Sequence, residues 1–296
     1  MEAKTKCRAK DPSLCWKHGT KQGLVALKSI KKAIASPTGR YYLSPEQRFH
    51  APLKALTATG LTLAILDHTR SASGIDTLRV QNAILLSSYL HREDRRTNRG
   101  RYDRTAYIEH PLRNSLRAIR YGDTSEAVIV GSILHDTVED HAFEISKEFY
   151  GVEAKTEAEA RANSLAYIKN TYGSRIMNMV EGMSNPIVAN KHTLAAIKNK
   201  QYADHVKEAI EDPDVCVGKV CDFVDNAVGL RHNEGGMSKV SIQKKATKYL
   251  PVCDILLERL ERAKNEPDFP ASIRGINLMI KQIKSGKESL IRLLED

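Results

Sequence analysis

The sequence predicts an all-α protein, and three observations carry this prediction. Apolar residues recur three and four residues apart through most of the chain, the spacing that lines one face of a helix. No segment shows the strict apolar and polar alternation of a half-buried strand, and no internal repeat stands out. Proline, glycine, serine and asparagine residues fall between the apolar stretches, where helices end. At 296 residues, the chain is long enough for one large domain or two small ones.

The first expected helix covers about 45–68 and carries a start signal. Ser44 is a candidate N-cap, Pro45 takes the first helical position, and Gln47 stands three residues after the cap. A charged segment at 91–105 is too polar for a core and is expected to be an arginine-bearing surface loop. The other helices are expected over about 76–94, 107–120, 127–134, 154–170, 172–183, 190–211, 215–230, 238–264 and 271–294.

The composition is that of an ordinary globular protein with a marked positive charge. The chain is 41% hydrophobic and 28% charged, with a formal net charge of +10. Such a charge attracts polyanions, either nucleic acid or a small substrate that carries several phosphates. Few aromatic residues interleave with the basic ones, and no zinc-finger or RNP-type signature is present. A dedicated nucleic-acid module is therefore the weaker interpretation.

Hydropathy and cysteine usage indicate the compartment. No apolar run is long enough to cross a bilayer, and the first residues lack the apolar core of a signal peptide. We therefore expect a cytoplasmic protein without a membrane partner. Five cysteines in a chain of this length do not suggest a disulfide framework. Three of them have apolar neighbours and are expected in the core: Cys216, Cys221 and Cys253.

A second group of candidate ligands lies near the N-terminus. Cys7, Cys15 and His18 are three of the four ligands that a zinc site needs, and His50 is a candidate fourth. The simpler interpretation is a pair of isolated thiols in a flexible leader.

The rest of the chain is organised around the stretch GSILHDTVEDH at 131–141. His135 and Asp136 follow an apolar run that predicts a buried helix, and Glu139 and Asp140 come one turn later. Unpaired carboxylates at the end of a buried segment are costly, so they need a cation, a hydrogen-bond network or water. The plain alternative is a solvated helix end without chemistry.

Two other segments supply matching ligand types. His110 precedes Pro111, which suits a helix start, and Asp222 lies within the mostly apolar segment VCVGKVCDFV. Together with His135 and Asp136, these residues give two imidazoles and two carboxylates. A mixed nitrogen and oxygen site of this kind suits manganese, iron, cobalt or zinc. Such an ion activates water and neutralises phosphate charge, which favours metal-assisted phosphoester hydrolysis.

This ordered set resembles the HD phosphohydrolase superfamily and, more narrowly, the hydrolase domain of the RelA/SpoT homologues and the small alarmone hydrolases. The resemblance covers roughly residues 76–260 and rests on four segments: YIEHP, LHDTVED, YGSRIMNMVEGMSNP and KVCDFVDN. It implies an HD-domain helical bundle at 76–265. A basic N-terminal extension with one helix would precede it at 1–75, and a C-terminal helix at 266–296 would pack on it.

The resemblance also implies a reaction and residue roles. Removal of the 3′-pyrophosphate from guanosine tetra- or pentaphosphate is expected, usually with manganese. Glu139 and Asp140 match the acidic pair that acts on the attacking water and the leaving group. Asn226 matches a nucleotide contact, and Arg101 matches the arginine that packs on the base. The implied metal ligands are His110, His135, Asp136 and Asp222. The other loop arginines either gather phosphates or stay solvated: Arg92, Arg95, Arg96, Arg99 and Arg104.

Several positions depart from the family pattern. Phe223 and Asp225 stand where arginine and histidine are common, Gly229 replaces a frequent threonine, and 150–172 looks like an insertion. These departures leave the ligand set intact but put base recognition in doubt. Two alternatives therefore stay open. One is an HD phosphatase or phosphodiesterase for another nucleotide, such as NADPH or a dNTP. The other is a non-catalytic basic module that binds nucleic acid or a protein partner.

Overall fold

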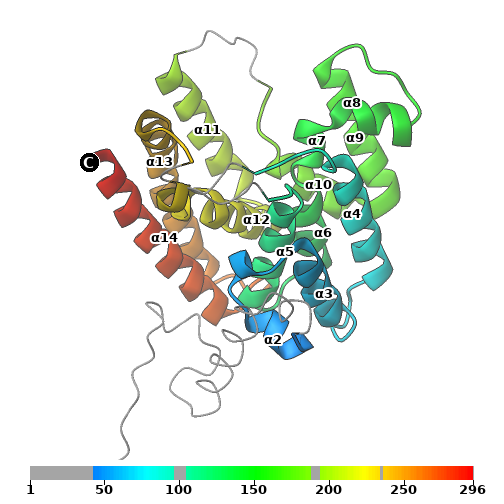
Figure 1. The fold of residues 1–296 in the computed structure, drawn as a ribbon, viewed down its shortest axis with the longest axis horizontal. Helices are drawn as coiled ribbons and strands as arrows, with labels where there is room; N and C mark the ends of the chain where they lie inside the picture. The colour runs from blue at the N-terminus through cyan, green and yellow to red at the C-terminus, as the bar shows by residue number, and fades with distance from the viewer. Residues whose placement is uncertain (1–42, 97–104, 188–193, 234–235, 296) are drawn as a thin grey trace, which may run out of the picture.

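The computed structural model describes residues 43–96, 105–187, 194–233 and 236–295 (Figure 1). Within these ranges the chain is built from helices, and the only strand-like feature is an isolated antiparallel bridge between Arg95 and Ala106. The all-α prediction is therefore confirmed for the described part of the chain. Some residues singled out from the sequence lie outside the described ranges: Cys7, Cys15, His18, Arg99, Arg101 and Arg104.

The single helix expected at 45–68 is divided into three pieces. They are α2 (Pro45–His50), the 3₁₀ turn η3 (Leu53–Ala55) and α3 (Ala58–Thr69). The predicted capping box at the start of α2 is present. Pro52 follows α2 and cannot donate a helical hydrogen bond. Thr57 then starts α3 by accepting from the Gly60 amide at 3.3 Å.

The helix α6 packs against α4, α5, α10 and α12 and is buried along its whole length after its first residue. This agrees with the uninterrupted apolar run of the sequence. The elements in this half are α4 (Thr77–Leu90), α5 (Glu109–Tyr121), α6 (Glu126–Leu134), α7 (Thr137–Asp140), α8 (Ala142–Glu144), the π-helical turn η4 (Ile145–Phe149), α9 (Glu157–Tyr172) and α10 (Ser174–Met183).

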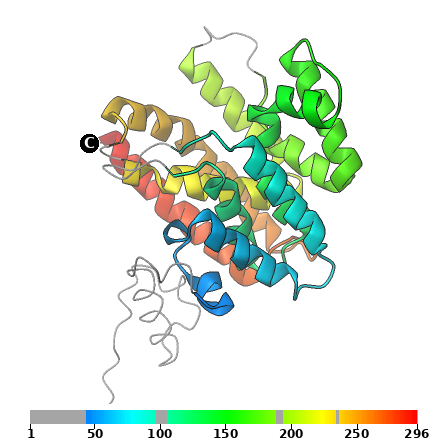
Figure 2. The ribbon, with the colours of Figure 1, turned by 45° about the vertical axis from the view of Figure 1, so that its right-hand side comes forward.

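The C-terminal half contains a second group of helices. In Figures 1 and 2, α14 runs alongside α13 on the side of the molecule opposite α8 and α9. The elements here are α11 (Ala195–Ala209), α12 (Pro213–Phe223), the π-helical turn η5 (Val224–Val228), the 3₁₀ turn η6 (Leu230–Asn233), α13 (Lys239–Ala263) and α14 (Ile273–Glu295). The helix expected at 215–230 thus starts earlier, behind the Asp212 cap, and changes to a wider turn after Phe223.

The buried apolar residues form two cores that meet at α5. The N-terminal core gathers side chains of α3, α4, α6 and α9, whereas the C-terminal core gathers those of α11 to α14, and α10 contributes to both. α5 serves both, because Leu112 and Leu116 belong to the first and Ala118 and Tyr121 to the second. We refer to this boundary as the seam. Cys216, Cys221 and Cys253 are free and fully buried in the C-terminal core, as predicted.

A backbone contact fixes α14 against the end of α5. The Tyr121 carbonyl accepts from the Ser272 amide at 3.2 Å and from its hydroxyl at 2.7 Å. Gly275 lies in the next turn, and a β-carbon at this position would overlap the same carbonyl group. Only glycine allows so close an approach of the two helices.

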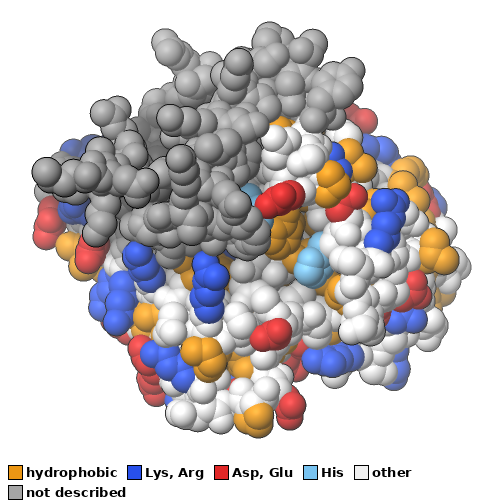
Figure 3. Space-filling view, turned by 90° about the horizontal axis from the view of Figure 1, so that it is seen from below, with side chains coloured by type: hydrophobic (Ala, Val, Ile, Leu, Met, Phe, Trp, Pro, Cys, Tyr) orange, Lys and Arg blue, Asp and Glu red, His pale blue; other side chains and the backbone are white. Residues whose placement is uncertain are grey.

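The described surface is mixed in charge. On the face in Figure 3, lysine and arginine side chains are scattered among acidic and apolar ones in the area that is not grey. No helix in the described ranges is long and apolar enough to span a bilayer.

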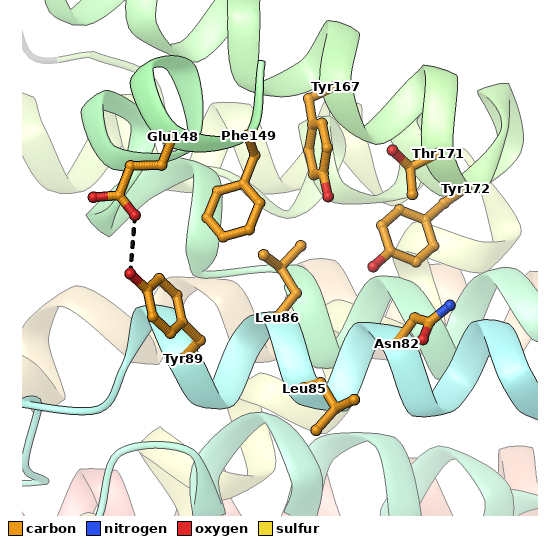
Figure 4. Close-up of a pocket in the computed structure, with 9 residues that line it drawn as sticks. All are labelled: Asn82, Leu85, Leu86, Tyr89, Glu148, Phe149, Tyr167, Thr171 and Tyr172. Carbon is orange, nitrogen blue, oxygen red and sulfur yellow. Dashed lines mark hydrogen bonds between the residues drawn. The ribbon is translucent and has the colours of Figure 1, made fainter. Parts of the chain in front are cut away.

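An apolar pocket of about 580 Å³ opens between α4 and α9 (Figure 4). The Tyr89 hydroxyl donates to Glu148 at 2.9 Å across it. The lining is mainly aromatic and aliphatic: Asn82, Leu85, Leu86, Tyr89, Glu148, Phe149, Tyr167, Thr171 and Tyr172.

Candidate metal centre

Four side chains from three places in the chain converge at the seam. His110 lies in the first turn of α5, His135 and Asp136 occupy the break between α6 and α7, and Asp222 belongs to α12. The His110 Nε2 atom is 3.0 Å from an Asp222 oxygen and 3.6 Å from an Asp136 oxygen. The His135 Nε2 atom is 3.1 Å from Asp136 and 3.8 Å from Asp222. His110, His135 and Asp136 alone already present ligand atoms within 4.8 Å of one another.

Local hydrogen bonds fix the break between α6 and α7 at which the buried His135 lies. The Nδ1 atom of His135 lies 2.9 Å from the Ser132 carbonyl, and the Thr137 hydroxyl donates to the Leu134 carbonyl at 2.6 Å. These bonds satisfy carbonyl groups at the end of α6, where the helix itself cannot. The apolar run ends at Leu134, so the polar residues His135 and Asp136 follow directly at the C-terminal end of the buried helix.

The histidine tautomers make the site suitable for a cation. A carbonyl oxygen only accepts, so His135 Nδ1 must carry the proton, and Nε2 is left with a lone pair when the ring is neutral. This Nε2 atom is buried without a hydrogen-bond partner although Asp136 lies 3.1 Å away. Two electron-rich atoms this close require a positive charge between them. The residues therefore fit a divalent metal ion of the type that binds imidazole and carboxylate together.

Asp225 holds His110 in the matching orientation. Its Oδ2 atom accepts from His110 Nδ1 at 2.8 Å, which directs His110 Nε2 toward Asp222 and Asp136. Asp225 is 1% exposed and also accepts two hydrogen bonds from Arg113, at 3.0 and 2.9 Å, and one from Arg117 at 3.2 Å. Metal-binding histidines commonly donate their other ring nitrogen to such a carboxylate.

The electrostatics of the site favour a bound positive charge. Burial would lower the pKa of His135, but Asp136 and Asp222 raise it well above its ordinary value. Burial would likewise raise the pKa of the Asp225 carboxyl, but Arg113, His110 and Arg117 hold it well below its usual range. Without a metal ion, a proton on His135 supplies the charge that the carboxylates demand.

The two acidic residues after the break have different surroundings. Glu139 accepts from the Asn185 backbone amide at 2.9 Å and from its side-chain amide at 3.0 Å, so it is fixed in place. Asp140 is exposed. Partial burial and the neighbouring charges of Asp136 and Glu139 raise the pKa of Asp140 to about 6. This carboxyl can therefore hold or release a proton near neutral pH.

A basic pocket of about 250 Å³ adjoins the ligand cluster. Asn226 joins the two, because it donates to Asp222 at 2.7 Å and accepts from Arg96 at 2.7 Å. Tyr107 also lies in both, since its hydroxyl donates to Asp136 at 2.8 Å. The pocket lining combines cationic, aromatic and amide groups: Arg95, Arg96, Tyr107, Asp225, Asn226, Asn233, Lys245 and Tyr249.

Several residues at this site were not identified from the sequence. Lys245 and Tyr249 line the pocket from α13, while Arg113 and Arg117 hold Asp225. The two arginines had a usable signal, because they stand four apart on α5 and each directly follows a buried leucine. The sequence contains no such signal for Lys245 and Tyr249, because they look like ordinary surface residues of an amphipathic helix.

The chain is similar to a solved structure at low identity. That structure is described as a metazoan orthologue of SpoT that hydrolyses ppGpp and plays a role in starvation responses. The alignment covers 69% of this chain and 93% of the other, with 18% sequence identity and a TM-score of 0.47. No protein-family model matches the chain, and no curated protein matches it.

The residues themselves define what the arrangement can do. Two imidazoles and two carboxylates are close enough together to bind one cation. The basic side chains of the adjoining pocket attract phosphate. Asp140, with its raised pKa, is near enough for Asp136 to influence its protonation. These are the parts that metal-dependent hydrolysis of a phosphate ester requires.

Proposed function

We propose that this protein is a metal-dependent phosphohydrolase that removes the 3′-pyrophosphate from guanosine tetra- or pentaphosphate. The observation that carries the proposal is the convergence of His110, His135, Asp136 and Asp222 beside a basic pocket. A divalent ion at such a site supplies Lewis-acid activation of water and neutralisation of phosphate charge. Manganese is the proposed ion because the resemblance to alarmone hydrolases implies it.

The chain's own residues position the reactants. Arg96 and Lys245 hold the phosphates by charge, and Asn226 contacts the nucleotide from between the pocket and the ligand cluster. Glu139, fixed by Asn185, orients the attacking water. Asp140 gives or takes the proton that the reaction moves, which its raised pKa permits. Arg101 is proposed to pack on the guanine base, as the resemblance implies.

The test uses the full chain with guanosine tetraphosphate. Wild-type protein is stripped of metal and reloaded with Mn²⁺, and released pyrophosphate is measured. Asp136→Asn keeps the side-chain volume but removes the ligand charge, so we expect a rate at least about 100-fold lower. Asp254→Asn, which alters an exposed ion pair between α13 and Lys287, is the control and should keep full activity. Equal rates for wild type and Asp136→Asn would refute the proposal.

One observation favours a second substrate. Asp225, which stands where the family pattern commonly has histidine, forms part of the pocket wall and is tied to His110. A carboxylate here changes what the pocket recognises. A panel with NADPH and dNTPs distinguishes the two: inorganic phosphate from one of these, with no pyrophosphate from guanosine tetraphosphate, assigns the protein to another nucleotide.

A further inference from the structure

A second cluster of histidine and carboxylate lies outside the centre described above. His91 ends α4, Asp94 follows in the next turn, and His141 stands between α7 and α8. One Asp94 oxygen is 2.8 Å from His91 Nδ1 and 2.8 Å from His141 Nε2. The two nitrogens are 3.1 Å apart. The three atoms thus form a nearly equilateral triangle.

The triangle has the dimensions of one face of a coordination octahedron. With bonds of about 2.1 Å, neighbouring ligands on an octahedral ion lie about 3.0 Å apart, and on a tetrahedral ion about 3.4 Å. The observed separations of 2.8, 2.8 and 3.1 Å match the octahedral value more closely. Two histidines and one carboxylate on one face form an arrangement that proteins use for borderline divalent ions.

Neighbouring side chains hold the two histidine rings of the cluster in place, as is usual for metal-binding histidines. His91 is 1% exposed and stacks on Tyr107, with ring centroids 4.7 Å apart. His141 Nδ1 lies 3.5 Å from a carboxylate oxygen of Glu144, which is itself paired with Arg92 at 2.7 Å. A carboxylate behind a ligand histidine fixes its ring and increases its basicity.

Hydrogen bonding alone leaves the cluster crowded. If both rings donate to Asp94, their two protons point at one oxygen from nitrogens only 3.1 Å apart. A divalent ion removes this crowding by replacing both protons.

An ion can reach the cluster from solvent. The side chains of Asp94 and His141 are 39% and 16% exposed, whereas that of His91 is fully covered. The open positions of an octahedral ion would therefore face outward. Tyr107 separates this cluster from the first centre, since it stacks on His91 and donates to Asp136.

We propose that His91, Asp94 and His141 bind a second divalent ion of the Fe²⁺, Co²⁺ and Zn²⁺ class. This site does not depend on the proposed hydrolysis, because its ligands are distinct from those of the first centre. The three residues form the inner face, and solvent or a small anion completes the coordination.

Cobalt binding to the purified full chain tests the site. The metal-stripped protein is dialysed against Co²⁺, and bound cobalt is measured by elemental analysis together with the visible absorption spectrum. We expect about two ions per wild-type chain and about one in Asp94→Asn and in His141→Gln. Asp136→Asn should lose the other ion, and the Asp94→Asn, Asp136→Asn double variant should lose both. His68→Gln, in a histidine of α3 outside both clusters, is the matched control and should bind two.

The result that overturns the proposal is equally direct. The proposed site is refuted if the Asp94→Asn and His141→Gln proteins fold and bind as much cobalt as wild type. Should these variants fail to fold, wild-type crystals soaked in Zn²⁺ decide the question by anomalous scattering. A peak within ligand distance of His91 Nδ1, Asp94 and His141 Nε2 supports the site, and no peak there at saturating Zn²⁺ overturns it.

Discussion

Asp225 combines two tasks in one buried carboxylate. It orients His110 and neutralises Arg113 and Arg117, both of which are nearly buried. Removing one partner of a buried ion pair is costly because the remaining charge stays unsolvated. The residue therefore links the stability of the seam to the geometry of the ligands.

Asp225→Asn should lower both stability and metal affinity. We expect the free energy of unfolding to fall by about 3 kcal/mol, since two guanidinium groups lose their counter-charge. Metal affinity should fall about 10- to 100-fold, the usual effect of losing a ligand's orienting partner. Urea unfolding and Mn²⁺ titration measure the two effects. Asp254→Asn should change the unfolding free energy by less than about 1 kcal/mol, and a similarly small change for Asp225→Asn would contradict the argument.

His135 makes metal binding depend on pH. Its folded-state pKa is raised well above the ordinary 6.5 by Asp136 and Asp222, with burial opposing. In the metal-free protein, the stability that this proton contributes is fully present below about pH 6.5, the ordinary pKa of histidine. This stabilisation is lost as pH rises through the higher folded-state pKa.

Because a metal ion and this proton compete for one ring nitrogen, Mn²⁺ binding at pH 7 should release about one proton. Affinity should rise as pH increases toward the folded-state pKa. Titration calorimetry in two buffers of different ionisation enthalpy counts the protons. An apparent enthalpy that is independent of the buffer would show that His135 is already neutral.

At the scale of elements, α6 illustrates what sequence patterning can and cannot predict. Its continuous apolar run correctly indicated a buried helix, because burial on every side needs no polar face. The break after Leu134 depends on side-chain hydrogen bonds from His135 and Thr137, which periodicity does not encode. The split of the first helix had a visible cause in Pro52, but the expected range of 45–68 ran across it.

The candidate site shows the same division between what a local pattern predicts and what it does not. Residues of the ligand set were recognisable because their types and order are unusual, and the structure brings all four together. The partners of Asp225 could not be recognised from the sequence, because Arg113 and Arg117 are more than 100 positions away from it in the chain. Pairings between buried charges depend on tertiary packing, which no local pattern records.

Gly275 determines how closely α14 approaches the end of α5. In Gly275→Ala, the added methyl group meets the Tyr121 carbonyl, which is backbone and cannot rotate away. We expect a loss of about 2–3 kcal/mol, the upper part of the usual overpacking range. Urea unfolding measures it, with the exposed Lys284→Ala on the same helix as control, expected within about 0.5 kcal/mol of wild type. Unchanged stability in Gly275→Ala would mean that α14 can shift outward freely.

At the scale of the whole molecule, charge and chemistry are separated along the chain. Residues 1–42 contain ten Lys or Arg and two Asp or Glu, which is +8 of the chain's +10. The part that carries the candidate site is therefore nearly neutral overall, and its attraction for phosphate is local to the pocket around Arg96 and Lys245.

Removing residues 1–42 should separate polyanion binding from hydrolysis. The shortened chain should elute from heparin at clearly lower salt, because fewer counterions are exchanged. Mn²⁺-dependent pyrophosphate release should stay within about twofold, since the shortened chain keeps every residue of the ligand set and of the pocket. A parallel fall in hydrolysis would instead indicate that this segment contributes to substrate binding.

The position of the ligands at the seam has a consequence for how the molecule opens. Asp222 belongs to the helices around the C-terminal core, whereas His135 and Asp136 end the central helix of the N-terminal one. An ion held by both would couple the local opening of the two halves. Chelation should then speed amide hydrogen exchange in α5 and α12 together, although neither helix loses a residue of its own apolar packing.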